Sequence, residues 1–367
     1  MSFRRGLQLA GYARRHLGRM ARGRHQVMAH LAAPRPENLP MPTFVQLRVT
    51  NLCNLRCKMC GQWGDTGIYR SDGFSASATD GEKERERIRE LIGANRQLAL
   101  SDWVRLLDEI AAWRPIVSLF GGEPLLYPEI LQLVREIKRR DLTCTVITNG
   151  GRLEPYAKEL VEAGIDSIAV SIDGPPEVHN RIRGKADSFD KAAAGIRAVA
   201  EWRRRLGRAT PMQIAILPIT ELNLEAIAPA MEVLRELPLD TINIGLRWFI
   251  PKKVGADYER VMREEFGIRA ESWKGFDFDA ASIPATRAQQ LGEVVKLLKG
   301  LRRRRFLDSS LGRPWVSFVP DVPAEKVPEY FSDFSQTFGH QMCPVAWYFA
   351  QVEPDGEVCF CGDFPDY

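Results

Sequence analysis

The stretch VTNLCNLRCKMC, residues 49–60, places Cys53, Cys57 and Cys60 at Cys-x3-Cys-x2-Cys spacing. It follows the run 44–49, whose β-branched and apolar residues predict a β-strand. Three soft thiolates can bind three corners of an iron–sulfur cube and leave the fourth iron open to another molecule. We therefore expect the chemistry of the chain to take place at that open iron.

The cysteine pattern argues against two other uses of thiols. The seven cysteines are odd in number and unevenly placed, which is not the pattern of a secreted disulfide framework and favours a reducing, cytoplasmic setting. A structural zinc site would want four ligands, and no second Cys-x2-Cys pair or ligating His lies near Cys53. Cys144 lies inside an apolar run, so we expect it in the core.

Strand and helix patterns alternate after the cysteine loop. We expect strands over residues 116–120, 142–148, 167–172, 212–219 and 241–248, and helices over 101–113, 128–140, 153–163, 189–206 and 223–236. Together with the first strand, six β–α steps with continuous apolar strands predict an α/β fold with a parallel sheet. In such sheets, ligands bind at the carboxyl ends of the strands.

Motifs with binding chemistry end several of these strands. Gly121 and Gly122 would let the backbone approach a ligand, and Glu123, before Pro124, offers acceptors for an ammonium group. Asn149 ends the third predicted strand. Ser171 and Asp173 end the fourth, where a hydroxyl and a carboxylate can bond ribose hydroxyls. Together with the cysteine loop, four motif segments are expected at one edge of the sheet.

These motifs resemble those of the radical S-adenosylmethionine (radical SAM) superfamily, strongly over about residues 43–250. The resemblance implies a partial (β/α)6 TIM-like barrel and a 4Fe–4S cluster on Cys53, Cys57 and Cys60. It implies reductive cleavage of S-adenosylmethionine at the open iron to methionine and a 5′-deoxyadenosyl radical, which abstracts a substrate hydrogen. The residue before the third cysteine is often aromatic in the family, and here it is Met59, a familiar variation.

The resemblance also assigns contacts to the cofactor. It implies that Gly121–Pro124 hold the methionyl amine and that Ser171 contacts the ribose. Asp173 either shares that role or orders its turn, and Asn149 either contacts the cofactor or orders the strand end. Arg183, in the segment HNRIRG, either pairs with a cofactor or substrate carboxylate or forms a structural ion pair.

A second group of thiols lies near the C-terminus. Cys343 and Cys361, on either side of Gly356, match the opening of the SPASM or twitch module, which binds auxiliary iron–sulfur clusters, and Cys359 lies beside them. Residues 352–358 predict a hairpin with a Pro-Asp-Gly turn. An auxiliary cluster needs about four ligands and this group offers three, so whether such a cluster forms is left open.

The sequence divides into four expected parts: a basic N-terminal helix (1–36), the barrel (43–250), a connecting, substrate-covering segment (251–340) and an incomplete SPASM-like module (341–367). Within the third part we expect an irregular stretch over 251–282, a helix over 285–305, a strand over 315–319 and a short helix over 323–338. Residues 61–99 read as an inserted loop with a charged helix over 82–91. The loop and the third part would cover the substrate.

Charge and hydropathy limit which classes of binding partner the chain is expected to have. The net charge of +4 is too small to indicate nucleic acid, and no run of about 18 apolar residues predicts a membrane span. Residues 1–35 hold eight arginines and no acidic residue, which suits anionic lipid, an acidic partner, a transit peptide or simply a solvated helix packed on its own domain.

Membership of the family would further imply an electron donor such as flavodoxin or ferredoxin. Relatives with a SPASM-like extension commonly modify peptides or proteins, which makes a peptide substrate our preference. A sugar or other small molecule is the alternative. A non-catalytic iron–sulfur carrier or a zinc-stabilised binding protein would explain neither the glycine motif nor the open coordination site.

Overall fold

The computed structural model describes residues 18, 21, 23, 25–32, 39–64, 97–268, 270, 272–277, 283–304, 314–339, 343 and 345–361. The predicted helix over 82–91 lies outside these residues. Residues 25–32 are helical, as the N-terminal pattern predicts, and Val27 is buried. Among the described helices, none combines the length and apolar character needed to cross a bilayer.

One sheet organises the molecule. Its strands lie in the order β7-β6-β5-β4-β3-β2-β1-β8-β9, and every neighbouring pair is parallel except β8 and β9. The strands are β1 (Phe44–Thr50), β2 (Ile116–Gly121), β3 (Thr143–Thr148), β4 (Ser167–Ser171), β5 (Met212–Ile219), β6 (Thr241–Leu246), β7 (Trp315–Val319), β8 (Phe349–Val352) and β9 (Val358–Cys359). The predicted α/β fold with six consecutive parallel strands is confirmed.

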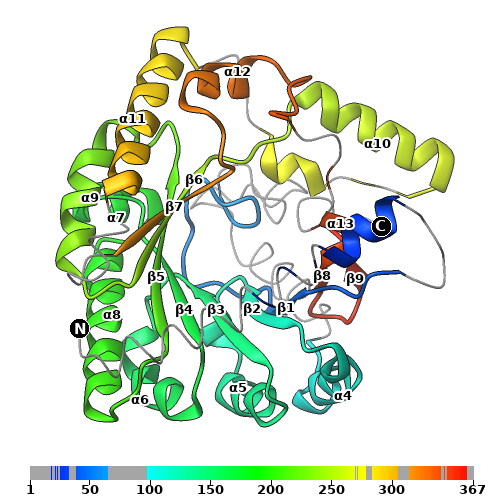
Figure 1. Ribbon diagram of the computed structural model, residues 1–367, viewed down its shortest axis with the longest axis vertical. Helices are drawn as coiled ribbons and strands as arrows, with labels where there is room; N and C mark the ends of the chain where they lie inside the picture. The colour runs from blue at the N-terminus through cyan, green and yellow to red at the C-terminus, as the bar shows by residue number, and fades with distance from the viewer. Residues whose placement is uncertain are drawn as a thin grey trace, which may run out of the picture.

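Helices connect the parallel strands. They are α4 (Leu100–Ile110), η2 (Ala111–Trp113), η3 (Pro124–Leu126), α5 (Ile130–Arg139), α6 (Leu153–Ala163), α7 (Pro176–Arg183), α8 (Ser188–Arg205), η4 (Leu224–Ala226) and α9 (Ile227–Glu236). Figure 1 shows α4, α5, α6, α8 and α9 along the outer face of the curved sheet. In α5, Ile130, Leu133, Val134 and Ile137 recur at helical spacing and are all fully buried. This apolar stripe holds the helix against the strands.

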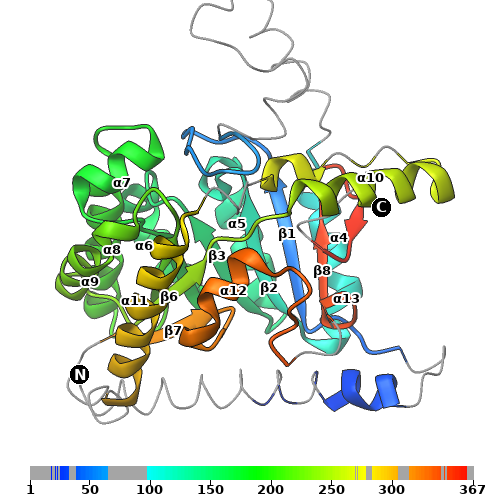
Figure 2. The same cartoon turned by 90° about the horizontal axis from the view of Figure 1, so that it is seen from above.

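The part after residue 250 has the expected helix and strand as α11 (Ala285–Arg304) and β7, and differs from the prediction before them. It also contains α10 (Lys252–Phe266), η5 (Ser272–Phe276), η8 (Ala324–Lys326), α12 (Val327–Ser332) and α13 (Val345–Tyr348). The expected irregular stretch over 251–282 is therefore wrong for residues 252–266. Only Gly255 and Met262 of α10 are buried, so the helix carries almost no apolar stripe for a sequence pattern to reveal. Figures 1 and 2 both place α10 on the side of the molecule that carries β8.

The C-terminal hairpin is confirmed, and it is part of the main sheet. β8 pairs with β9 in antiparallel fashion, as the Pro-Asp-Gly turn predicts, and β8 also pairs in parallel with β1. Across that pair Arg48 Nη1 donates to Glu353 Oε2 at 2.9 Å, with both side chains largely buried. β8 extends the barrel sheet and does not start a second sheet. The division of the chain at residue 341 into a separate module stays a prediction.

Candidate active site

The cysteine loop leaves the carboxyl end of β1 and is held by backbone hydrogen bonds. The amide of Cys60 donates to the carbonyl of Cys57 at 3.0 Å, and the amide of Gly64 donates to the carbonyl of Cys60 at 2.8 Å. The amide of Lys58 donates to the carbonyl of Ile182, at the end of α7, at 2.9 Å. Turns inside the loop and one tie to a neighbouring helix therefore fix where the three thiols lie.

Each of the three sulfur atoms faces at least one N–H donor. The Nδ2 of Asn149 lies 4.0 Å from Cys53 Sγ, the Nη1 of Arg183 lies 3.7 Å from Cys57 Sγ, and the amide of Trp63 lies 3.4 Å from Cys60 Sγ. N–H donors aimed at sulfur stabilise thiolates and tune the reduction potential of iron–sulfur clusters. The donor set of the loop therefore fits a bound cluster.

Two of the thiols, Cys53 and Cys57, favour the protonated form. Burial raises the pKa of Cys53 to about 12 and raises the pKa of Cys57, and the neighbouring cysteines raise both further. Thiolates are the form of cysteine that binds metals. Binding of a cluster would therefore release the thiol protons, and the iron would compensate the negative charge of the thiolates. No three His, Cys, Asp or Glu side chains within the described parts of the chain converge on a single metal ion. An iron–sulfur cube differs from a single metal ion, because each cysteine binds a different iron and the three thiols are therefore farther apart.

The glycine motif after β2 lies directly on the cysteine loop. The amide of Gly122 donates to the carbonyl of Thr50 at 2.8 Å, and the amide of Glu123 donates to the carbonyl of Leu52 at 2.7 Å. A Cβ on Gly122 would lie 2.2 Å from the carbonyl oxygen of Leu52, which no real contact allows. The glycines are thus required for close approach of two backbone segments, in addition to any ligand.

The carboxylate of Glu123 is fully buried beneath this loop. One oxygen accepts from the amide of Leu125 at 3.1 Å and from the hydroxyl of Thr148 at 2.7 Å, and the other accepts from the amide of Asn149 at 2.8 Å. Burial raises its pKa although these hydrogen bonds oppose the shift. Three of its roughly four acceptor positions are filled, so the side chain joins β2 to β3. Its contact with an ammonium group stays a prediction.

Arg183 and Asp173 form a buried ion pair. The Nε and Nη2 of Arg183 donate to the two carboxylate oxygens of Asp173 at 2.5 and 2.8 Å. Nearby, the amide of Asp173 donates to Nδ1 of the fully buried His179 at 3.1 Å. Of the two roles left open for each residue, the pair supplies the structural one, because Asp173 is fully buried. Arg183 also lines the cavity described next, so its expected contact with a cofactor carboxylate is compatible with the pair.

A cavity of about 390 Å³ lies above the cysteine loop at the carboxyl ends of the strands. Of the predicted site residues it is lined by Cys53, Cys57, Met59, Cys60, Gly121, Gly122, Asn149, Ser171 and Arg183. Glu123, Pro124 and Asp173 are buried and do not line it. The fold therefore brings the four motif segments to one edge, as the strand-end rule predicts.

The rest of this cavity was predicted only by segment, through the 61–99 loop and the 251–340 part, or not at all. It is lined by Gln62, Trp63, Phe120, Ile147, Thr148, Ile216, Pro218, Thr220, Leu246, Arg247, Trp248, Gly275 and Phe276. The residues at the ends of β5 and β6 follow the same strand-end rule and could have been found by it. Gly275 and Phe276 come from η5, whose place in the fold no local pattern indicates.

The three C-terminal cysteines do not form a cluster site as well defined as that of the cysteine loop. Cys359 is 2% exposed, and its Sγ lies 3.9 Å from Glu353 Oε1. Burial and this carboxylate raise the pKa of Cys359 to about 12. Cys343 is exposed and Cys361 half-buried. Because Cys359 is directed at a carboxylate, an auxiliary cluster on these residues stays a prediction.

Comparison with known proteins agrees with this geometry. Residues 47–205, which run from β1 to the end of α8, match the family model described as the Radical SAM superfamily. Over these residues the chain is similar to the radical SAM superfamily. The cofactors of that family are a 4Fe–4S cluster and S-adenosylmethionine, which suit the three thiols and the cavity above them.

The chain is also similar to enzymes of several kinds. It is 27% identical over 242 residues to the AdoMet-dependent heme synthase of Methanosarcina barkeri, covering 63% of this chain and 60% of the relative. It is 31% identical over 155 residues to the GTP 3′,8-cyclase of Lactiplantibacillus plantarum, covering 41% of this chain and 37% of the relative. The chain thus spans less than two thirds of either relative.

A solved structure supports the fold. The crystal structure of Streptococcus suis SuiB bound to its precursor peptide SuiA aligns with a TM-score of 0.53 at 14% identity, covering 96% of this chain and 64% of SuiB. At that identity the likeness concerns the fold alone.

Proposed function

We propose that the chain is a radical SAM enzyme that cleaves S-adenosylmethionine reductively and abstracts a hydrogen atom from a peptide or protein substrate. The observation that carries this proposal is the set of three thiols, each facing an N–H donor, at the floor of a cavity that the other motif segments line. When bound, the cluster and S-adenosylmethionine supply the 5′-deoxyadenosyl radical. The residues of the chain bind the cofactors, orient the substrate and shield the radical from other reactants.

Each group of residues has a distinct part in this reaction. Cys53, Cys57 and Cys60, which line the cavity, would hold the cluster. Gly121 and Gly122 line the cavity with backbone, which suits contact with the methionyl amine and carboxylate. Ser171 lines it from the end of β4, where its hydroxyl suits a ribose contact.

The apolar and aromatic lining has a protective part. Ile216, Leu246 and Phe276 line the cavity beside the polar groups. A primary carbon radical abstracts hydrogen from any C–H group within reach, so a site for it must position its substrate and exclude other reactants. We propose that a substrate completes this enclosure on the side of Trp248, which is 55% exposed.

A peptide substrate is supported by the likeness in fold to SuiB, which was solved with a precursor peptide. The relatives named as heme synthase and GTP 3′,8-cyclase make a tetrapyrrole or nucleotide the second candidate. We further propose that a flavodoxin or ferredoxin supplies the electron.

The proposal is tested by anaerobic reconstitution followed by assay for 5′-deoxyadenosine under a strong reductant. We expect the reconstituted chain to form it and Cys57→Ala to lose both the cluster's visible absorption and the product. Cys144→Ala is the matched control, because Cys144 is a buried thiol in β3 outside the cavity. A full cubane spectrum in Cys57→Ala would refute the ligand assignment, and a fully loaded cluster that leaves S-adenosylmethionine intact would refute the enzyme.

A further inference from the structure

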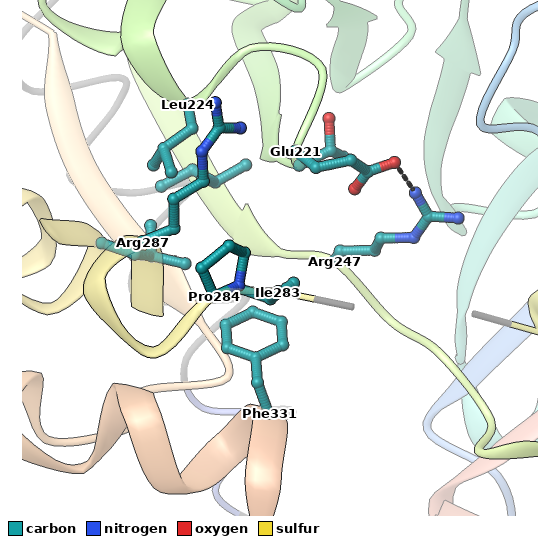
Figure 3. Close-up of a pocket in the computed structure, with 10 residues that line it drawn as sticks. Glu221, Leu224, Arg247, Ile283, Pro284, Arg287 and Phe331 are labelled. Carbon is teal, nitrogen blue, oxygen red and sulfur yellow. Dashed lines mark hydrogen bonds and ion pairs between the residues drawn. The ribbon is translucent and has the colours of Figure 1, made fainter. Parts of the chain in front are cut away.

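A second cavity, of about 340 Å³, adjoins the one above the cysteine loop. It is lined by Ile219, Thr220, Glu221, Leu224, Arg247, Ile283, Pro284, Arg287, Leu291 and Phe331. These residues come from the carboxyl ends of β5 and β6 and from η4, α11 and α12. Figure 3 shows Pro284 and Phe331 with Arg287 on one side and the Glu221–Arg247 pair on the other.

The two cavities share part of their walls. Thr220 and Arg247 line both of them. A ligand in the second cavity would therefore lie next to the space that S-adenosylmethionine is proposed to fill. A group seated there can position the adjoining part of the same molecule for attack by the radical.

The second cavity is mainly apolar. Six of its lining side chains are hydrocarbon or aromatic: Ile219, Leu224, Ile283, Pro284, Leu291 and Phe331. Such a lining favours an apolar group, because transfer of that group out of water is favourable by roughly 25 cal/mol per Å². A phosphate would meet two arginines, Arg247 and Arg287, that are already paired with Glu221 and Glu225.

One polar atom at the shared wall has no partner. Glu221 is paired with Arg247 through Oε1, whereas Glu221 Oε2 is shielded from solvent and accepts no hydrogen bond from the described residues. A buried acceptor without a donor is unfavourable by about 1–3 kcal/mol. In the present rotamer Oε2 is turned away from the open space, so a ligand reaches it once the Glu221 side chain rotates toward the cavity. A ligand that carries an N–H group beside an apolar group would then satisfy both features.

We propose that this cavity is a specificity pocket for the substrate, which takes one large apolar side chain of a peptide while Glu221 Oε2 accepts the N–H of that residue. The proposal rests on the proposed function for its place in the reaction. A residue of a peptide chain has an N–H directly beside its side chain, as the pocket requires. A carboxylate at the same place would meet the negative charge of Glu221.

The volume also favours a side chain over a macrocycle. Pockets that enclose whole small molecules range over about 300–1,000 Å³, and this cavity lies at the lower end. It suits a leucine- or phenylalanine-sized group whose backbone continues outside. A tetrapyrrole would need a larger space.

Binding can be measured without turnover. The probe is N-acetyl-4-fluorophenylalaninamide, followed by 19F NMR with the reconstituted, oxidised chain and S-adenosylmethionine. Leu224→Trp fills the pocket from η4, and Leu131→Trp on α5 is the matched control, because both leucines are half-buried and Leu131 lies outside both cavities. We expect Leu224→Trp to weaken probe binding at least about tenfold and Leu131→Trp to leave it unchanged.

A second comparison tests the N–H contact. We expect the ester analogue of the probe, in which oxygen replaces the acetylated N–H, to bind about tenfold more weakly to the native chain. In Glu221→Leu the two probes should bind equally. Probe binding that is unchanged in Leu224→Trp, or a coproporphyrin that binds in place of the probe, would overturn the pocket. Loss of 5′-deoxyadenosine formation with intact, pocket-dependent probe binding would overturn the proposed function alone.

Discussion

Asp173 connects three buried groups at the site. Its carboxylate receives two hydrogen bonds from Arg183, and its amide donates to His179. Its carbonyl accepts from Asn223 Nδ2 at 2.7 Å. Arg183 in turn reaches Cys57 Sγ. A residue that the sequence suggested for a ribose contact therefore positions the guanidinium beside a cluster ligand.

We expect Asp173→Asn to destabilise the fold by about 3–5 kcal/mol, because removal of one partner leaves a buried charge uncompensated. Urea unfolding measures this change. Asp141→Asn is the control, because Asp141 and its partner Arg114 are both mostly exposed, and such pairs contribute about 0–1 kcal/mol. Equal effects of the two substitutions would show that the buried pair adds nothing.

His179 predicts a dependence of stability on pH. Burial lowers its pKa to about 4, against about 6.5 in an unfolded chain. Between these values the unfolded chain binds a proton that the folded chain does not, so stability falls as the pH falls. From pH 7.5 to pH 5 this group should remove about 2 kcal/mol.

The measurement is urea unfolding at the two pH values, compared between the native chain and His179→Gln. We expect the variant to be less stable at pH 7.5 and to lose about 2 kcal/mol less than the native chain on acidification. Parallel losses in both proteins would mean that His179 is protonated in the fold.

Much of the site could be predicted from the sequence, because the types of its side chains and their spacing along the chain indicate which ligands they bind. Cys53, Cys57 and Cys60 share one cavity as their spacing predicts. The spacing could not decide whether Arg183 is a ligand contact or a structural ion, since that depends on a partner ten residues away along a turn and helix. The buried position of the Glu123 carboxylate likewise depends on Thr148 and Asn149 from another strand.

At the scale of helices and strands, the periodic spacing of apolar residues predicts those elements that bury an apolar face. The strands β1 to β6 and the helices α5, α6 and α8 follow from strong apolar patterns. The helix α10 was missed because little of it is buried, and the pairing of β8 with β1 was missed because it joins residues about 300 apart. The strand-end rule would have extended the site to Thr220 and Arg247 had it been applied to β5 and β6.

The contact between the end of β2 and the cysteine loop gives the element-scale prediction. We expect Gly122→Ala to destabilise the chain by at least about 1–3 kcal/mol and to reduce cluster binding, because its Cβ would meet backbone oxygens of Leu52 and Asn51 at 2.2 and 2.6 Å. Cluster content and urea unfolding measure this. Gly300→Ala in α11 meets nothing within 4 Å and should instead stabilise by about 0.5–1 kcal/mol. Full cluster loading of Gly122→Ala would show that the loops can separate.

At the scale of the whole molecule, the C-terminal segment completes the side of the sheet on which the cysteine loop begins. Four register pairs join β1 to β8, and Phe44 stacks on Phe349 with ring centroids 5.9 Å apart. The amide of Leu98 donates to the carbonyl of Pro354 at 2.8 Å. The sequence suggested a separate module over 341–367, because thiol spacing carries no information about which strand a hairpin joins.

Removal of residues 345–367 distinguishes these two descriptions. Because β8 pairs with β1, its loss exposes the edge of β1 and removes the Glu353 carboxylate that accepts from Arg48. An unpaired strand edge invites association with other chains. We expect a lower unfolding midpoint, concentration-dependent association in light scattering and poorer cluster loading at Cys53, Cys57 and Cys60. Removal of residues 362–367 alone is the control, because it keeps β8 and β9. A monomeric truncated chain with unchanged stability and a full cluster would instead establish a separable module.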